Sequence, residues 1–219
     1  MRSLMQKLAF AGGLMTVAVV ILPPLGSAAQ QLFALHMAQH LLLIAVAAPL
    51  LIVSRAFDGL SRLTPVREAT KPASAWIGFV GVFLFWHWPA AFQWAAGSAA
   101  SRLLEYGTIL AAAMLFWSVA LSDQGHERFS YGARALFVMT AAVATDLPGV
   151  IMVFSPRAIC TMPDENALRW GLTPLQDQQI AGLLMWVPAN LVFFGIATWL
   201  FARWISGASP HKPFSQVMT

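Results

Sequence analysis

Charged side chains and cysteine are both scarce in this 219-residue sequence. Only 10% of the residues are Asp, Glu, Lys or Arg, whereas roughly a quarter of an average soluble domain is charged. The one cysteine, Cys160, cannot form an intramolecular disulfide, so no cystine framework holds the fold. Hydrophobic residues make up 58% of the chain, and the mean hydropathy is +0.68. These values exclude a soluble globular protein, and the modest net charge of +4 gives no support to nucleic-acid binding.

The apolar residues are grouped in runs of about 20 residues, separated by short linkers that contain Pro, Gly or Asp. A helix of about 20 residues spans a hydrocarbon core of about 30 Å, because the rise per residue is about 1.5 Å. We therefore predict an all-α, polytopic transmembrane helical bundle of about six spans, in a single domain covering residues 1–219. The predicted spans are Leu8–Leu22, Leu32–Val53, Ala75–Ala96, Leu103–Leu121, Ala133–Phe154 and Leu175–Phe201.

The first run has two interpretations. Arg2 and Lys7 precede an apolar stretch that ends at the small residues Gly26, Ser27 and Ala28, a pattern that fits a cleavable signal peptide as well as a span. Residues 1–30 are therefore a first span or a signal peptide, and residues 31–205 form a core bundle of five spans that carries the polar motifs. Cleavage would leave the orientation of those five spans unchanged.

Lysine and arginine are unevenly distributed between the two sides of the predicted bundle. Membrane proteins carry more of these residues in their cytoplasmic loops. Of the 13 Lys and Arg residues, three fall on the side away from the termini, namely Arg102, Arg157 and Arg169. The other ten are Arg2, Lys7, Arg55, Arg62, Arg67, Lys71, Arg128, Arg134, Arg203 and Lys212. We therefore predict that both termini are cytoplasmic.

Three histidines lie inside predicted spans, where ionisable side chains are costly and usually face the interior of the bundle. His36 and His40 are four residues apart and therefore share one face of the second span. At about 1.5 Å per residue, His40 lies about 12 Å below the outer end of its span, and His87 lies about 14 Å below the outer end of the third span. We therefore expect all three histidines within reach of one ion.

Acidic side chains approach the same half of the membrane from other spans. Asp146 lies about 12 Å below the outer end of the fifth span, and Glu105 and Asp177 begin the fourth and sixth spans from the outer side. Asp146 is a candidate ligand, or a carboxylate that orients a histidine. The sequence Thr173-Pro174-Leu175-Gln176 predicts a capping box with proline at the first helical position, which sets the start of the last span.

This set of side chains suits a metal ion. His36, His40 and His87 supply three imidazoles, and Met37 lies three residues before His40 on the same helix. Imidazole together with thioether favours copper, particularly Cu(I), over hard cations. A purely structural role also fits these residues, with the histidines and Asp146 making hydrogen bonds between helices.

Three other functions fit parts of the pattern. His40 and His87, at matched depth, could be the axial ligands of haem in an electron-transfer protein. A membrane zinc hydrolase is disfavoured, because the second span lacks the glutamate that serves as general base in a His-Glu-x-x-His motif. A copper permease is disfavoured, because the inner halves of the spans lack ionisable residues for a continuous pathway.

Three motifs follow one another along the chain and place polar residues within apolar spans. They are His36-Met37-x-x-His40-Leu41-Leu42 running into Ala48-Pro49-Leu50-Leu51, then Phe85-Trp86-His87-x-Pro89, then Asp177-Gln178-x-x-x-Gly182-x-x-Met185-Trp186-x-Pro188. Together, over about residues 32–201, they resemble the integral membrane family of caa3-type cytochrome c oxidase assembly factors, the CtaG-like family.

The resemblance implies a multi-pass protein of the bacterial inner (plasma) membrane that helps to assemble a haem-copper terminal oxidase by delivering copper, without enzymatic activity. Its implied partners are cytochrome c oxidase subunits, besides membrane lipid. The family's histidines match His36, His40 and His87, and its acidic motif matches Asp177 with Gln178. The complete predicted metal set is His36, His40, His87, Met37, Asp146 and Asp177. We expect copper in a pocket that faces the periplasm, with haem as the alternative cofactor.

Overall fold

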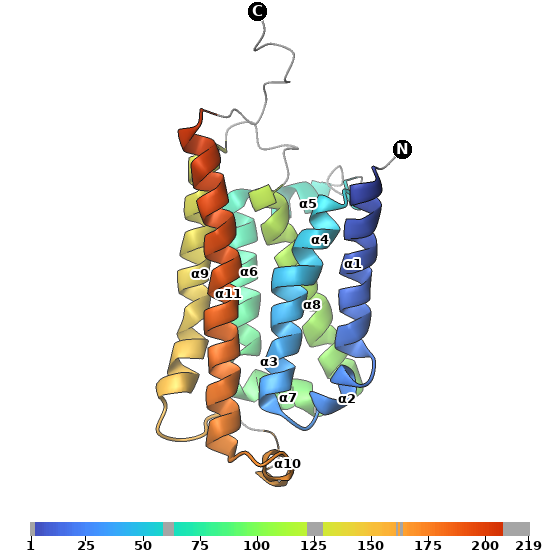
Figure 1. The fold of residues 1–219 in the computed structure, drawn as a ribbon, viewed down its shortest axis with the longest axis vertical. Helices are drawn as coiled ribbons and strands as arrows, with labels where there is room; N and C mark the ends of the chain where they lie inside the picture. The colour runs from blue at the N-terminus through green and yellow to red at the C-terminus, as the bar shows by residue number, and fades with distance from the viewer. Residues whose placement is uncertain (1–2, 59–63, 122–128, 161, 163, 208–219) are drawn as a thin grey trace, which may run out of the picture.

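The computed structural model describes residues 3–58, 64–121, 129–160, 162 and 164–207, and every regular element in these ranges is a helix. The all-α prediction is confirmed. Figure 1 shows the long helices side by side in one bundle, with the start of α1 and the end of α11 at the same end. The elements are α1 (Leu4–Ile21), α2 (Leu25–Ala28), α3 (Phe33–Leu42), η1 (Leu43–Ala47), α4 (Ala48–Val53), α5 (Thr64–Ala69), α6 (Pro72–Trp86), α7 (Pro89–Ala96), α8 (Ala99–Leu121), α9 (Tyr131–Phe154), α10 (Asp164–Arg169) and α11 (Pro174–Ile205).

The number of spans agrees with the prediction of about six. In the described ranges, five helical segments are long and apolar enough to cross a membrane, and a sixth span results if the bent pair α6 and α7 counts as one. Large apolar side chains such as Leu8, Phe154 and Leu191 are exposed on the outside of the bundle, as lipid contact requires. The five segments are Leu4–Ile21, Phe33–Val53, Ala99–Leu121, Tyr131–Phe154 and Pro174–Ile205.

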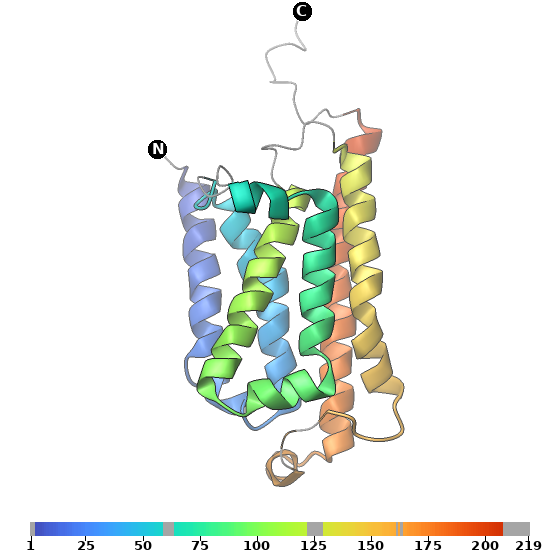
Figure 2. The same ribbon diagram turned by 180° about the vertical axis from the view of Figure 1, so that it is seen from behind.

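The third predicted span, Ala75–Ala96, is a broken helix in the structure. α6 ends at Trp86, α7 begins at Pro89, and the pair is bent by 72°. The cause is Pro89, which lacks a backbone N–H and keeps the preceding residue, Trp88, extended at φ −73° and ψ 132°. Figure 2 shows α7, in green, lying across the end of the bundle opposite the chain termini. His87 lies at the corner between the two helices.

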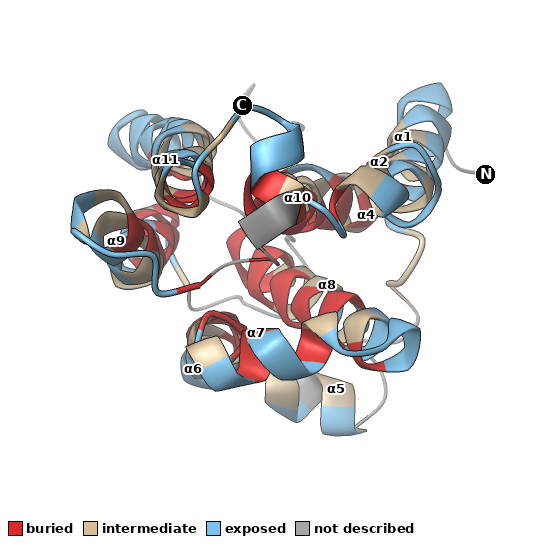
Figure 3. Ribbon diagram, turned by 90° about the horizontal axis from the view of Figure 1, so that it is seen from below, coloured by how far each residue is buried: buried red, intermediate tan, exposed pale blue. Residues whose placement is uncertain are grey.

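The core of the bundle is built around α8. Figure 3 shows that the buried residues of α6, α9 and α11 face the middle of the bundle, where α8 lies. The ring of Phe116 on α8 stacks on Phe79 of α6 and Phe137 of α9, at centroid distances of 4.6 and 4.7 Å. The Trp117 indole donates a hydrogen bond of 2.7 Å to the carbonyl of Ile44. That carbonyl belongs to η1, a π-helical turn within the second span, and such turns are frequent at functional sites.

Two glycines allow α9 and α11 to approach closely. An ideal Cβ on Gly182 would lie 2.7 Å from the backbone oxygen of Gly149, so a larger residue would push the helices apart. Small residues have this role at many helix interfaces in membranes. α11 also packs along α3, which brings its first turn to the start of the helix that carries His36 and His40.

Candidate metal centre

Two histidines and one glutamate meet between α3 and α8. His36 and His40 share one face of α3, with ring centroids 4.6 Å apart, and Glu105 faces them from α8. Oε1 of Glu105 lies 3.1 Å from Nε2 of His36 and 3.2 Å from Nε2 of His40. One ligand atom from each residue lies within 4.8 Å of the other two. Small side-chain movements would bring all three to bonding distance, about 2 Å, from one ion.

The three side chains are almost completely removed from solvent. The exposed fractions are 1% for each histidine and 0% for Glu105. Burying a carboxylate without a positive partner destabilises a protein by on the order of several kcal/mol. Glu105 therefore requires a proton or a cation between itself and the two imidazoles.

Tyr106 links His36 to Gln39 next to the cluster. Nε2 of Gln39 donates to the Val20 carbonyl of α1 at 2.5 Å, which leaves Oε1 of Gln39 to accept from the Tyr106 hydroxyl, also at 2.5 Å. The Tyr106 hydroxyl oxygen also lies 3.4 Å from Nδ1 of His36. The proton of a neutral His36 ring lies either on Nδ1, toward Tyr106, or on Nε2, toward Glu105.

Nε2 of His36 faces the Glu105 oxygen at 3.1 Å; it donates to the carboxylate when it carries the ring proton and can bind a cation when it does not. Metal-binding histidines commonly have the second tautomer set by an outer hydrogen bond, and the Tyr106 hydroxyl oxygen is placed to accept one from Nδ1. His40 adds a second imidazole, and neither of its nitrogens has a hydrogen-bond partner among the described residues. The site therefore offers two imidazole nitrogens and one carboxylate to a cation.

Asp177 holds the start of α3. Its two carboxylate oxygens accept hydrogen bonds from the backbone amides of Phe33 at 2.8 Å and Ala34 at 2.9 Å. A helix leaves its first amides without internal partners, so Asp177 caps α3 just before His36. The predicted capping box at Thr173, which starts α11, is confirmed. The structure thus places Asp177 as a helix cap, apart from the cluster of His36, His40 and Glu105.

The neighbouring Gln178 fastens the segment that follows α9. Its Oε1 accepts from the amide of Cys160 at 3.0 Å, and its Nε2 donates to the carbonyl of Met152 at 3.1 Å. Gln178 is fully buried. The acidic motif of the sequence therefore joins three parts of the chain at one end of the bundle.

His87 lies beside the cluster. Its ring centroid is 5.3 Å from that of His40, and Nδ1 is 2.6 Å from the Phe83 carbonyl. The structure thus brings the three predicted histidines together. His87 reaches His40 from the corner between α6 and α7.

The remaining predicted ligands are Met37 and Asp146. Met37 is 1% exposed and packs in the hydrophobic core. Asp146 is half-buried and accepts a hydrogen bond of 2.9 Å from Asn190, which links α9 to α11. Within the described ranges, Asp146 does not belong to the group of acidic and histidine side chains that could share an ion.

Glu105 is the residue that sequence reasoning did not assign as a ligand. The sequence places it at the start of the fourth span, next to the apolar Leu103 and Leu104. An acidic residue in such a run indicates a side chain that faces the interior of the bundle. The sequence does not define the rotation of α8 about its axis, which decides that Glu105 faces His36 and His40.

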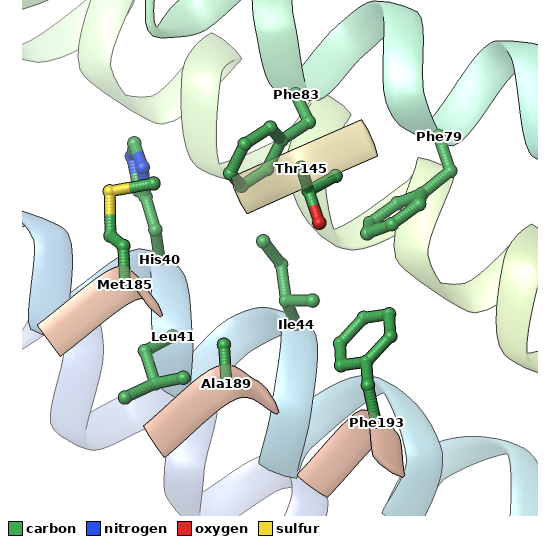
Figure 4. A pocket seen from close by; sticks show the side chains of 9 residues that line it. All are labelled: His40, Leu41, Ile44, Phe79, Phe83, Thr145, Met185, Ala189 and Phe193. Carbon is green, nitrogen blue, oxygen red and sulfur yellow. The ribbon is translucent and has the colours of Figure 1, made fainter. Parts of the chain in front are cut away.

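A cavity of about 30 Å³ adjoins His40. Figure 4 shows its walls, which come from α3, η1, α6, α9 and α11. A cavity of this size holds a single water molecule or ion. The lining residues are His40, Leu41, Ile44, Phe79, Phe83, Thr145, Met185, Ala189 and Phe193.

Comparison with known proteins identifies the family. The family model for the cytochrome c oxidase caa3 assembly factor matches residues 2–207, nearly the whole chain. The chain therefore belongs to this family, and the resemblance seen in the three motifs is confirmed. No curated protein and no solved structure matches the chain.

Proposed function

We propose that this chain is a non-enzymatic assembly factor that binds copper at His36, His40 and Glu105 and delivers it to a subunit of a haem-copper cytochrome c oxidase. Family membership supports the link to the oxidase. The buried group of two imidazoles and a carboxylate supports the metal. The observation that carries the proposal is the buried Glu105 carboxylate, whose Oε1 lies 3.1 Å from Nε2 of His36 and 3.2 Å from Nε2 of His40, because an ion among these atoms would balance the buried negative charge.

The donor set favours a divalent ion. Imidazole nitrogen suits copper and zinc, and a carboxylate as third donor is harder than the thioether expected from the sequence. The carboxylate also lowers the net charge that a divalent ion brings into an apolar interior. Among the divalent first-row metals, copper binds such donors most tightly.

We also propose that the centre faces the periplasm in the bacterial plasma membrane. His36 lies three residues after Phe33, the first residue of α3, and hence about 5 Å from the helix start. This is the end of the bundle opposite the chain termini (Figure 1). The excess of Lys and Arg on the side of the termini favours that side as cytoplasmic. Copper would then enter and leave on the periplasmic side, where a partner subunit can approach.

The geometry gives less support to haem. Axial histidines lie on opposite faces of the macrocycle, whereas the rings of His40 and His87 meet edge to face, with centroids 5.3 Å apart and an interplanar angle of 76°. Phe83 stacks on His87 at 4.0 Å. These contacts leave no space for a porphyrin between the two rings.

Metal analysis of the full chain, purified in detergent and loaded with copper, tests the proposal. The unsubstituted chain should retain about one copper ion, without the absorption bands of haem. Glu105→Gln keeps the size of the side chain and removes its charge, so it should lose most of the copper. Asp146→Asn makes the same chemical change at the Asn190 pair and should retain the ion. Equal copper content in Glu105→Gln and the unsubstituted chain would contradict the proposed site.

A further inference from the structure

The side chain of His87 is held as a metal-binding histidine would be. Its Nδ1–H donates to the Phe83 carbonyl at 2.6 Å, so Nε2 of the neutral ring has a lone pair and no proton. Nε2 is buried and, in the described part of the chain, has no hydrogen-bond partner. A backbone carbonyl on Nδ1 is a common way to orient a ligating imidazole. A buried acceptor with no partner is costly, which a bound ion would relieve.

His40 and Met185 lie on the wall of one cavity next to this ring. The His40 and His87 rings are 5.3 Å apart, and both nitrogens of His40 lack a hydrogen-bond partner among the residues that the structure describes. Met185, from α11, lines the same cavity of about 30 Å³ as His40 (Figure 4). Nε2 of His40 is directed toward Glu105, at 3.2 Å, so Nδ1 is the nitrogen available for a second ligand group.

We propose that His40, His87 and Met185 form a second metal site, selective for a soft monovalent ion such as Cu(I). The proposal rests on the proposed function only in taking copper as the ion that the chain handles. Two imidazole nitrogens and one thioether are soft or borderline donors, which select Cu(I) over divalent competitors. All three side chains are buried, with His87 the most exposed at 9%.

Charge separates the second site from the first. His40, His87 and Met185 are neutral donors, so a divalent ion would keep its full double charge in an apolar cavity, whereas a monovalent ion keeps a single charge. The first site contains the Glu105 carboxylate and so accommodates a divalent ion better. The two sites share His40, and therefore the chain holds one ion at a time, at a position set by its charge and softness.

Titration of the detergent-purified full chain with Ag(I) and Zn(II) tests this selectivity. Ag(I) is a probe for Cu(I) that does not change oxidation state, and Zn(II) is a probe for a divalent ion. His87→Ala and Met185→Leu should weaken Ag(I) binding by more than about tenfold, as loss of a contributing group does at metal sites, and leave Zn(II) affinity within about twofold. Glu105→Gln should weaken Zn(II) binding by a similar factor and change Ag(I) affinity little.

Met152→Leu is the matched control for Met185→Leu. Met152 is also a buried methionine, at 4% exposure, but does not line the cavity. The Met152→Leu variant should bind both Ag(I) and Zn(II) with the affinities of the unsubstituted chain. Thermal unfolding of each variant in detergent checks that the bundle is intact, since Met→Leu conserves volume.

Two outcomes would overturn the second site. One is unchanged Ag(I) affinity in both His87→Ala and Met185→Leu. The other is an equal loss in Met185→Leu and Met152→Leu, because a general packing effect would explain it. Either result leaves the first site standing, since that site is judged by Glu105→Gln. X-ray absorption of Cu(I)-loaded protein adds a direct readout, in which a sulfur neighbour should be present and should disappear in Met185→Leu.

Discussion

The carboxylate of Asp177 accepts the backbone N–H of Phe33 at 2.8 Å, across 144 residues of sequence. This contact ties the first turn of α11 to the first turn of α3, and with it the axial position of His36 and His40. The start of a helix is a place where buried amides need an external acceptor. Asp177 thus positions the helix that carries His36 and His40, two of the proposed ligands.

Asp177→Ala should destabilise the protein and weaken metal binding together. The amides of Phe33 and Ala34 would lose their acceptor in a buried position, at a cost of about 1–3 kcal/mol. Thermal unfolding and copper titration in detergent measure both effects. Gln176→Ala is the control, because Gln176 is exposed and caps only its own helix, so copper affinity should stay the same. A destabilised Asp177→Ala protein with unchanged copper affinity would show that the cap does not position the centre.

Much of this arrangement follows from local sequence signals. The start of α11 at Thr173 and the shared face of His36 and His40 depend on residue spacing within one helix. The partner of Asp146 and the approach of Glu105 depend on how helices rotate about their axes, which apolar sequence patterns leave undefined. Pro89 marks the position of the bend between α6 and α7, but the angle of 72° depends on how both helices pack against α8, which the local sequence does not define.

Tyr106→Phe should lower the affinity for a divalent ion while preserving the fold. The phenol hydroxyl donates to Gln39 and places its oxygen 3.4 Å from Nδ1 of His36, so its loss removes the group that can hold the His36 proton on Nδ1 when Nε2 binds an ion. Loss of an outer hydrogen bond typically lowers metal affinity by about 10–100-fold. Competition with a chelator of known affinity measures the change. Tyr131→Phe, which removes a phenol near Arg203 instead, should bind normally. Matching affinities for the two variants would remove the proposed role of Tyr106.

Gly182→Ala should weaken the packing of α9 against α11. The added Cβ would lie 2.7 Å from the Gly149 oxygen and 2.9 Å from a Val153 methyl group, and overpacking of this kind costs about 1–3 kcal/mol. Gly195→Ala on the same helix is the control, because no described atom lies within 4 Å of its Cβ, and it should be neutral or slightly stabilising. Unfolding in mixed detergent measures both. Equal stability of the two variants would show that the close approach does not limit packing.

Cys160 should react slowly with thiol reagents near neutral pH. Burial raises the pKa of this thiol to about 11 from its usual value of 9.0, and the thiolate is the reactive form. The labelling rate should therefore rise steadily as the pH increases toward 11. Because the folded protein keeps the proton that the unfolded chain loses, this thiol should also reduce stability as the pH rises from about 9 to about 11.

Gln178→Ala should speed the labelling of Cys160, since Gln178 holds the Cys160 amide. An unchanged labelling rate would show that burial alone protects the thiol.

Glu105→Gln should lower oxidase activity in cells when copper is limiting. The substitution removes the charge of the carboxylate that lies beside both histidines and that would stabilise the proposed divalent ion, while the apolar spans that insert the chain are untouched. Added copper should restore part of the activity, because a weaker site fills at higher copper concentration. Asp146→Asn should support normal activity at the same protein level. The proposed mechanism would fail if the Glu105→Gln strain had full oxidase activity at limiting copper while the purified variant held no copper. Oxidase assembly would then not depend on metal binding, and this protein would act as a scaffold for the oxidase subunits.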